Sequence, residues 1–197
     1  MKYFLKTLQV DIENNKIIPI LANHSYGYWI NGGHTGYQKE AQEIVKSWLE
    51  LNKDKIKLIY KIENYLFSHA GICNEWLQDF LQTTYTIELN DNLINKANNL
   101  WLNSDENAHK NLLYKNQLSP IWLRPTNTRL YLTYPRHFIQ IIGHTPVETI
   151  KMLPWDDSKI YFGDTHSLYS DLTNIGDKSY LLINTDKSKN EQIKIIY

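Results

Sequence analysis

The stretch FIQIIGHT, residues 138–145, joins a run of apolar residues to a histidine where the run ends. A short apolar run that is bounded by glycine predicts a buried β-strand. Two other stretches have the same form, IIPILANH at residues 17–24 and YLFSHAG at residues 65–71. The ends of strands in a layered sheet gather at one rim, where active sites collect. We therefore expect the side chains that follow these three strands to lie close together.

Each of these strands ends at a side chain that can bind a metal ion: Asn23, His69 and His144. Imidazole nitrogens suit Zn, Mn, Fe and Ni, and an amide oxygen suits the harder ions of that series. A single histidine at the end of a strand is more often a structural residue. Three such ends in one chain favour a metal site, while a metal-free domain with satisfied histidines stays an alternative.

The rest of the chain alternates short strands with amphipathic helices, which predicts a single layered α+β domain over residues 1–197. Residues 74–119 are expected to form a helical insertion, or lid, within it. The expected helices are 3–15, 38–51 and most of 74–118; the further expected strands are 56–60, 159–162 and an antiparallel pair at 179–183 and 193–197.

The charge balance excludes several classes of partner. The chain has 197 residues, with 21 Lys and Arg against 21 Asp and Glu. A nucleic-acid binder or a protein that binds anionic membranes needs an excess of basic residues, so neither is expected. No apolar run is long enough to span a membrane. The lone cysteine, Cys73, excludes an intrachain disulfide, so we expect a reduced, cytoplasmic protein.

Five motifs, in the same order along the chain, resemble those of the calcineurin-like metallophosphoesterases, in particular the bacterial serine/threonine protein phosphatases. No one of them is specific, but the ordered set is. They are LANHS (21–25), WINGG (29–33) with Thr35, FSHAGI (67–72), IWLR (121–124) and IGHTP (142–146).

This resemblance implies an α/β/β/α sandwich and the hydrolysis of phosphate monoesters by a metal-activated water. The expected substrate is a phosphoprotein, modified at serine or threonine, or a small phosphoester of the nucleotide type. Asn23, His69 and His144 would bind a divalent ion, with Mn expected first and Fe, Zn or Ni as alternatives. His24 would protonate the leaving group, and Arg124 would bind the phosphate oxygens.

The motifs that open the family, Gly-Asp-x-His-Gly and Gly-Asp-x-x-Asp-Arg-Gly, do not precede Asn23. They supply the ligands of the first metal and the bridging aspartate. The chain therefore resembles the C-terminal two-thirds of the family, without the first strands and helix of the sandwich. We expect activity to require the missing segment, or a complementing N-terminal polypeptide. The alternative is a non-catalytic remnant of a phosphatase that acts as a binding domain.

The stretch YFGDTHS, residues 161–167, has the Gly-Asp-x-His spacing of the missing first motif. No Gly-Asp-x-x-Asp-Arg-Gly follows it, and the family often has a strand that ends in Asp-Thr at this distance after Gly-His-Thr. We therefore interpret Asp164 and His166 as structural or rim residues in preference to metal ligands.

Overall fold

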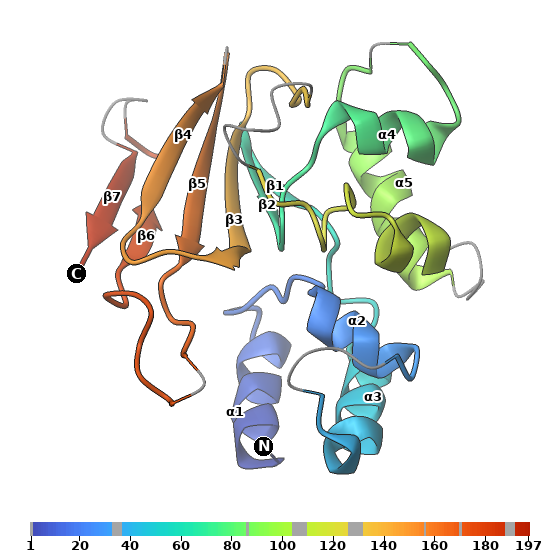
Figure 1. Ribbon diagram of the computed structural model, residues 1–197, viewed down its shortest axis with the longest axis vertical. Helices are drawn as coiled ribbons and strands as arrows, with labels where there is room; N and C mark the ends of the chain where they lie inside the picture. Colours follow the sequence, from blue (N-terminus) through green and yellow to red (C-terminus); the bar gives the residue numbers. More distant parts are fainter. Residues whose placement is uncertain are drawn as a thin grey trace.

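The computed structural model describes residues 2–32, 37–85, 87–103, 110–125, 132–155, 157–169, 171–187 and 192–197. It is a mixed α+β fold, as predicted, with a central sheet that has helices against one face (Figure 1). Part of one predicted motif, Gly33 to Thr35, lies outside these residues. The helices are α1 (Lys2–Glu13), α2 (Asn23–Trp29), α3 (Gln42–Leu51), α4 (Asn74–Leu81) and α5 (Asp91–Leu102), with short turns η1 (Lys39–Ala41) and η2 (Lys110–Lys115).

The central sheet has five strands in the order β1-β2-β3-β5-β4. Its middle strands β2 (Tyr65–Ser68), β3 (Ile139–Pro146) and β5 (Ser158–Asp164) are parallel to one another. The outer strands β1 (Tyr60–Ile62) and β4 (Lys151–Trp155) are antiparallel to their neighbours. The parallel strands end at the same edge of the sheet, which faces α2 (Figure 1). This edge is where parallel strands bring functional side chains together.

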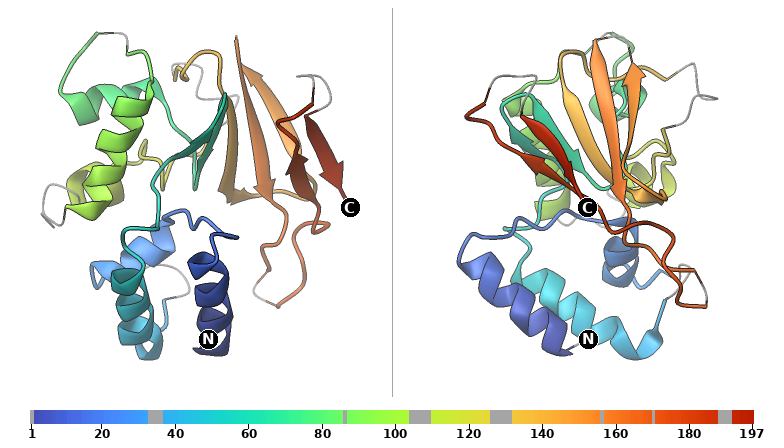
Figure 2. Two further views of the ribbon diagram at one scale, coloured as in Figure 1. Left: turned by 180° about the vertical axis from the view of Figure 1, so that it is seen from behind. Right: turned by 90° about the vertical axis from the view of Figure 1, so that its left-hand side faces the viewer.

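A second sheet consists of β6 (Tyr180–Ile183) and β7 (Ile193–Ile196), the antiparallel pair predicted at the end of the chain. It lies on the face of the central sheet opposite α4 and α5 (Figure 2). The Tyr65 hydroxyl donates a hydrogen bond of 2.7 Å to Gln192 Oε1 and ties the two sheets together. This order of layers is compatible with the predicted sandwich, which itself stays a prediction.

The predicted helical region at 74–119 contributes directly to the hydrophobic core. Trp76 and Leu77 of α4, with Ala97 of α5, are completely buried, and Trp101 is almost so. Burial of a large apolar side chain stabilises the fold by about 1.5–3 kcal/mol. Helices α4 and α5 therefore pack as a structural layer, and the lid function stays a prediction.

Two strand predictions are wrong. Of the strand predicted at residues 56–60, only Tyr60 lies in β1. Residues 17–21 form a single parallel bridge, between Ile20 and Lys57, and no regular strand. Leu21 N donates to Lys57 O and Lys57 N donates to Pro19 O, but proline has no N–H with which to extend the ladder. Ile17 and Ile18 are correspondingly exposed, at 38% and 41%.

Strand β3 also differs from its prediction, because it continues through His144 to Pro146. The register with β5 shifts between Ile142 and Pro146, so the strand carries an irregularity at the histidine. His144 has a φ of 62°, in the left-handed region. Helix α2 and strand β4 were not predicted. Within the described part of the chain, no helix has the length and apolarity needed to cross a membrane.

Candidate active site

The five residues predicted from the sequence line one pocket of about 760 Å³. Its lining residues include the start of α2 and the carboxyl ends of the parallel strands, and Figure 1 shows that this edge of the sheet faces α2. His69 directly follows β2, His144 lies near the C-terminal end of β3, and Asp164 ends β5. Residues from three adjacent strands and one helix thus meet there. The five predicted residues are Asn23, His24, His69, Arg124 and His144.

Of the three predicted metal ligands, His69 contacts both of the others. His69 Nε2 lies 2.8 Å from Asn23 Oδ1 and 3.1 Å from His144 Nδ1. One tautomer satisfies both contacts: His69 Nε2–H donates to the amide oxygen and to the deprotonated Nδ1 of His144. The proton on His69 Nε2 then lies between that nitrogen and two acceptor atoms, one from Asn23 and one from His144.

The electrostatics of the site keep both imidazoles uncharged. Burial lowers the pKa of His69 to about 3, with further lowering by His144, His24 and Arg124. Burial also lowers the pKa of His144 to about 4, with Arg124 and His24 adding to the effect while Asp164 opposes it. Neutral imidazole is the form of histidine that binds metals. His144 Nε2 is buried and has no hydrogen-bond partner, so one polar atom of this ring stays unsatisfied.

Asn23 and His24 are positioned by the first turn of α2. The Ser25 hydroxyl donates to Ala22 O and accepts from Ala22 N–H, which fixes the entry to the helix. Ala22 has φ −109° and ψ 158°, an extended conformation that any L-residue adopts. Asn23 is consequently buried at 3% exposure, while His24 is exposed toward the pocket.

Arg124 is an exposed cation on the wall of the pocket. Its Nη1 donates to His144 O and to Thr145 Oγ1, both at 3.3 Å. These contacts hold the guanidinium beside the histidines. Its planar fork suits the oxygens of a phosphate or carboxylate.

Two aromatic residues of the site were not identified from the sequence as site residues. The ring of Trp122 packs edge-on against His144, with centroids 5.8 Å apart and planes at 89°. Tyr114 lies 5.6 Å from Trp122 and 6.0 Å from Tyr26 of α2. This row of rings connects the helix that carries Asn23 to the strand that carries His144. The motif IWLR contained the signal for Trp122, but nothing in the sequence pointed to Tyr114.

Asp164 lines the pocket, whereas His166 is exposed and does not. Both Asp164 oxygens accept from the Ser167 hydroxyl, at 2.8 and 2.9 Å. Asp164 is the only carboxylate among the described residues that line this pocket. Across the described part of the chain, no three His, Cys, Asp or Glu side chains are placed to hold a metal ion together. The candidate ligand set is thus two histidines and an amide, which fits one ion of borderline type.

Neither a protein-family model nor a curated protein matches the chain. Distant structural likeness is found to a cold-active protein-tyrosine phosphatase of a psychrophile Shewanella species, at 16% identity and TM-score 0.45, covering 82% of this chain and 54% of that one. A mutant cold-active protein tyrosine phosphatase gives 18% identity and TM-score 0.47, covering 80% and 53%. A further structure of a cold-active protein tyrosine phosphatase gives 20% and 0.42, covering 72% and 46%.

The chain thus spans about half the length of the structures it matches. A likeness this distant does not transfer an activity. Membership of the calcineurin-like family stays a prediction from the motifs.

Proposed function

We propose that this chain carries the phosphate-binding half of a metal-dependent phosphoesterase of the calcineurin-like kind. The observation that carries the proposal is the contact of His69 Nε2 with both Asn23 Oδ1 and His144 Nδ1. These three atoms come from separate parts of the chain, and a divalent ion would replace the proton that they share. Mn²⁺ is the first candidate, with Fe, Zn and Ni as alternatives.

The proposed reaction is the hydrolysis of a phosphate monoester. A bound divalent ion supplies Lewis-acid polarisation of the phosphoryl group. Arg124 binds the phosphate oxygens from the wall of the pocket, and its positive charge partly neutralises the negative charge of the ester. Water oxygen attacks phosphorus and the bond to the leaving oxygen breaks. His24 donates a proton to that leaving oxygen, and the attacking water releases one of its protons to solvent. Phosphoproteins and small phosphoesters are the proposed substrates.

One observation favours a second candidate, a domain that binds phosphate and metal without turnover. Asp164 is the one described carboxylate in the pocket, and both of its oxygens already accept from Ser167. A neutral set of one amide and two imidazoles binds a dication weakly. Full activity would then require carboxylates from a complementing N-terminal polypeptide, which would also extend the proposed sandwich.

Metal binding and turnover, measured separately, test both candidates. Mn²⁺ binding is measured by calorimetry, and p-nitrophenyl phosphate hydrolysis is measured with Mn²⁺ and with EDTA. His69→Ala removes the central donor and should abolish saturable Mn²⁺ binding. His166→Ala is the matched control, because this exposed histidine is outside the pocket, and it should bind Mn²⁺ as the native protein does.

Metal-dependent turnover that His69→Ala abolishes supports the enzyme. Saturable Mn²⁺ binding without turnover supports the binding domain. If the folded native protein binds no divalent ion, or if His69→Ala binds as well as the native protein, the metal site is refuted.

A further inference from the structure

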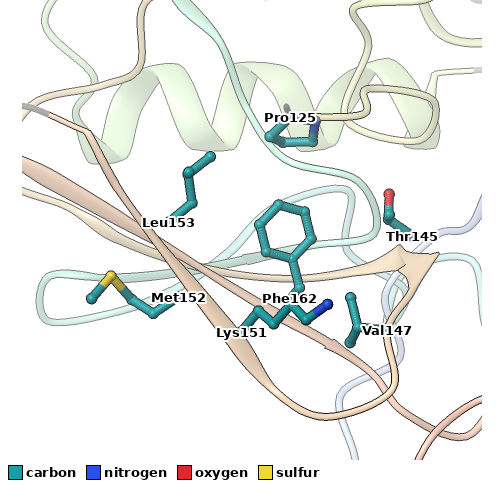
Figure 3. A pocket seen from close by; sticks show the side chains of 7 residues that line it. All are labelled: Pro125, Thr145, Val147, Lys151, Met152, Leu153 and Phe162. Carbon is teal, nitrogen blue, oxygen red and sulfur yellow. The ribbon is translucent and has the colours of Figure 1, made fainter. Parts of the chain in front are cut away.

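A second hollow, with apolar walls, lies beside the candidate active site. Its volume is about 340 Å³. In Figure 3 the Phe162 ring lies among the other lining residues, with Leu153 and Pro125 on one side of it and Thr145, which follows His144 in the chain, on another. Val147, Lys151 and Met152 complete the lining. Apolar hollows with a few polar groups at the edge are typical of small-molecule sites.

The apolar hollow and the candidate active site share a wall. Three pairs of residues, close in sequence, contribute one member to each side. Arg124 lines the active-site pocket while Pro125 lines the apolar hollow, and the same division holds for His144 with Thr145 and for Asp164 with Phe162. The contact of 3.3 Å between Arg124 Nη1 and Thr145 Oγ1 spans this wall. A molecule whose anionic end is bound by Arg124 therefore has an apolar surface within reach.

We propose that this hollow receives an aromatic ring, the organic group of a phosphoester whose phosphate is bound at Arg124. The inference rests on the proposed function, because it assigns a substrate class to the same site. It predicts a preference for aryl phosphates over phosphates of hydroxyl-rich compounds.

The size and chemistry of the hollow support an aromatic group. An engineered apolar cavity of about 150 Å³ in another protein holds benzene, so the volume here is sufficient for a ring with substituents. Phe162, Leu153 and Val147 form apolar walls. The polar groups of the lining are the Thr145 hydroxyl and the Lys151 ammonium. A sugar or glycerol phosphate would leave its hydroxyls without hydrogen bonds against these walls, which costs free energy.

Binding of two phosphonates tests the proposal independently of catalysis. Phenylphosphonate and methylphosphonate carry the same anionic group and are not hydrolysed. Their affinities are compared by calorimetry, with and without Mn²⁺, so that the ratio isolates the ring. The native protein should bind phenylphosphonate about tenfold more tightly, since ring burial removes apolar surface from water.

Leu153→Trp fills the hollow and should reduce this ratio to about one. Leu182→Trp makes the same change on exposed β6, away from the hollow, and should keep the native ratio. Leu153→Ala removes atoms only, and should shift the preference toward the larger 1-naphthylphosphonate. This last variant preserves the test if the tryptophan variant does not fold.

The outcomes separate the two proposals. Equal affinities in the native protein refute the aromatic site, while turnover of p-nitrophenyl phosphate judges the proposed function on its own. A phenyl preference that survives in Leu153→Trp also refutes the site, because the ring then binds elsewhere. If neither phosphonate binds, the aromatic site is refuted whatever the turnover, and the proposed function is judged separately by Mn²⁺ binding.

Discussion

Replacing Gly176 with alanine tests how the loop after β5 is held against the active site. A Cβ atom built on Gly176 would lie 2.5 Å from Thr165 O, 2.6 Å from Val147 O and 2.7 Å from Thr165 Cα. All three are backbone atoms, so no side-chain rotation can make room. The backbone itself would have to move apart at this point.

Two hydrogen bonds hold the loop in its place and would be strained by that movement. Asp177 N donates to Glu148 O at 2.8 Å, and Lys178 N donates to Thr165 O at 3.2 Å. Overpacking of a close contact costs about 1–3 kcal/mol. Each lost backbone hydrogen bond adds about 0.5–1.5 kcal/mol. We expect Gly176→Ala to lower the free energy of unfolding by about 2–4 kcal/mol.

Chemical denaturation followed by circular dichroism measures this loss. For a chain of this length, the expected destabilisation corresponds to a fall in Tm of about 4–16 °C. Gly143→Ala is the matched control, because its Cβ would meet His69 O at 3.7 Å, an ordinary contact. The control should differ from the native protein by less than about 0.5 kcal/mol. If Gly176→Ala were as stable as Gly143→Ala, the close approach of the two backbones would not exist in solution.

Two further predictions concern the core. Burial raises the pKa of the Cys73 thiol to about 12. The thiol is therefore harder to ionise in the folded protein than in the unfolded chain. The contribution of Cys73 to the free energy of unfolding is complete below the pKa of the unfolded chain and falls as pH rises from about 9 toward 12. Unfolding titrations at pH 8 and pH 10 should show a loss that Cys73→Ala reduces, and an unchanged pH slope in that variant would contradict the assignment. Asn98 Oδ1 accepts from Leu58 N and Ile59 N, and its Nδ2 donates to Ile59 O. Asn98→Ala should therefore destabilise the fold by about 2–4 kcal/mol in urea denaturation, and a loss below about 0.5 kcal/mol would show that water replaces the amide.

The sequence predicted the residues of the candidate site because a motif is a pattern of residue type and order. The apolar run before His69 predicted the end of β2 correctly, whereas the run before His144 predicted β3 but not its continuation to Pro146. The order of the motifs also gave Asn23, His24 and Arg124. Their places in the pocket agree with that prediction, although their roles are still proposals.

Local pattern failed where a long-range partner decides the structure. Residues 17–21 are as apolar as a strand. However, Pro19 has no N–H with which to extend a ladder, and the neighbouring backbone segment pairs with these residues only at Lys57. Strand β4 was missed because its residues alternate weakly, and pairing with β5 determines it.

What the sequence determined by itself was the identity and order of three candidate donors, Asn23, His69 and His144. Only the tertiary structure brought His69 Nε2 to within 2.8 Å of Asn23 Oδ1 and 3.1 Å of His144 Nδ1. The physical reason is that parallel pairing of β2, β3 and β5 aligns their carboxyl ends, a relation between residues far apart in the chain. The same pairing placed an apolar hollow beside Arg124, which the pattern of residues along the chain could not predict.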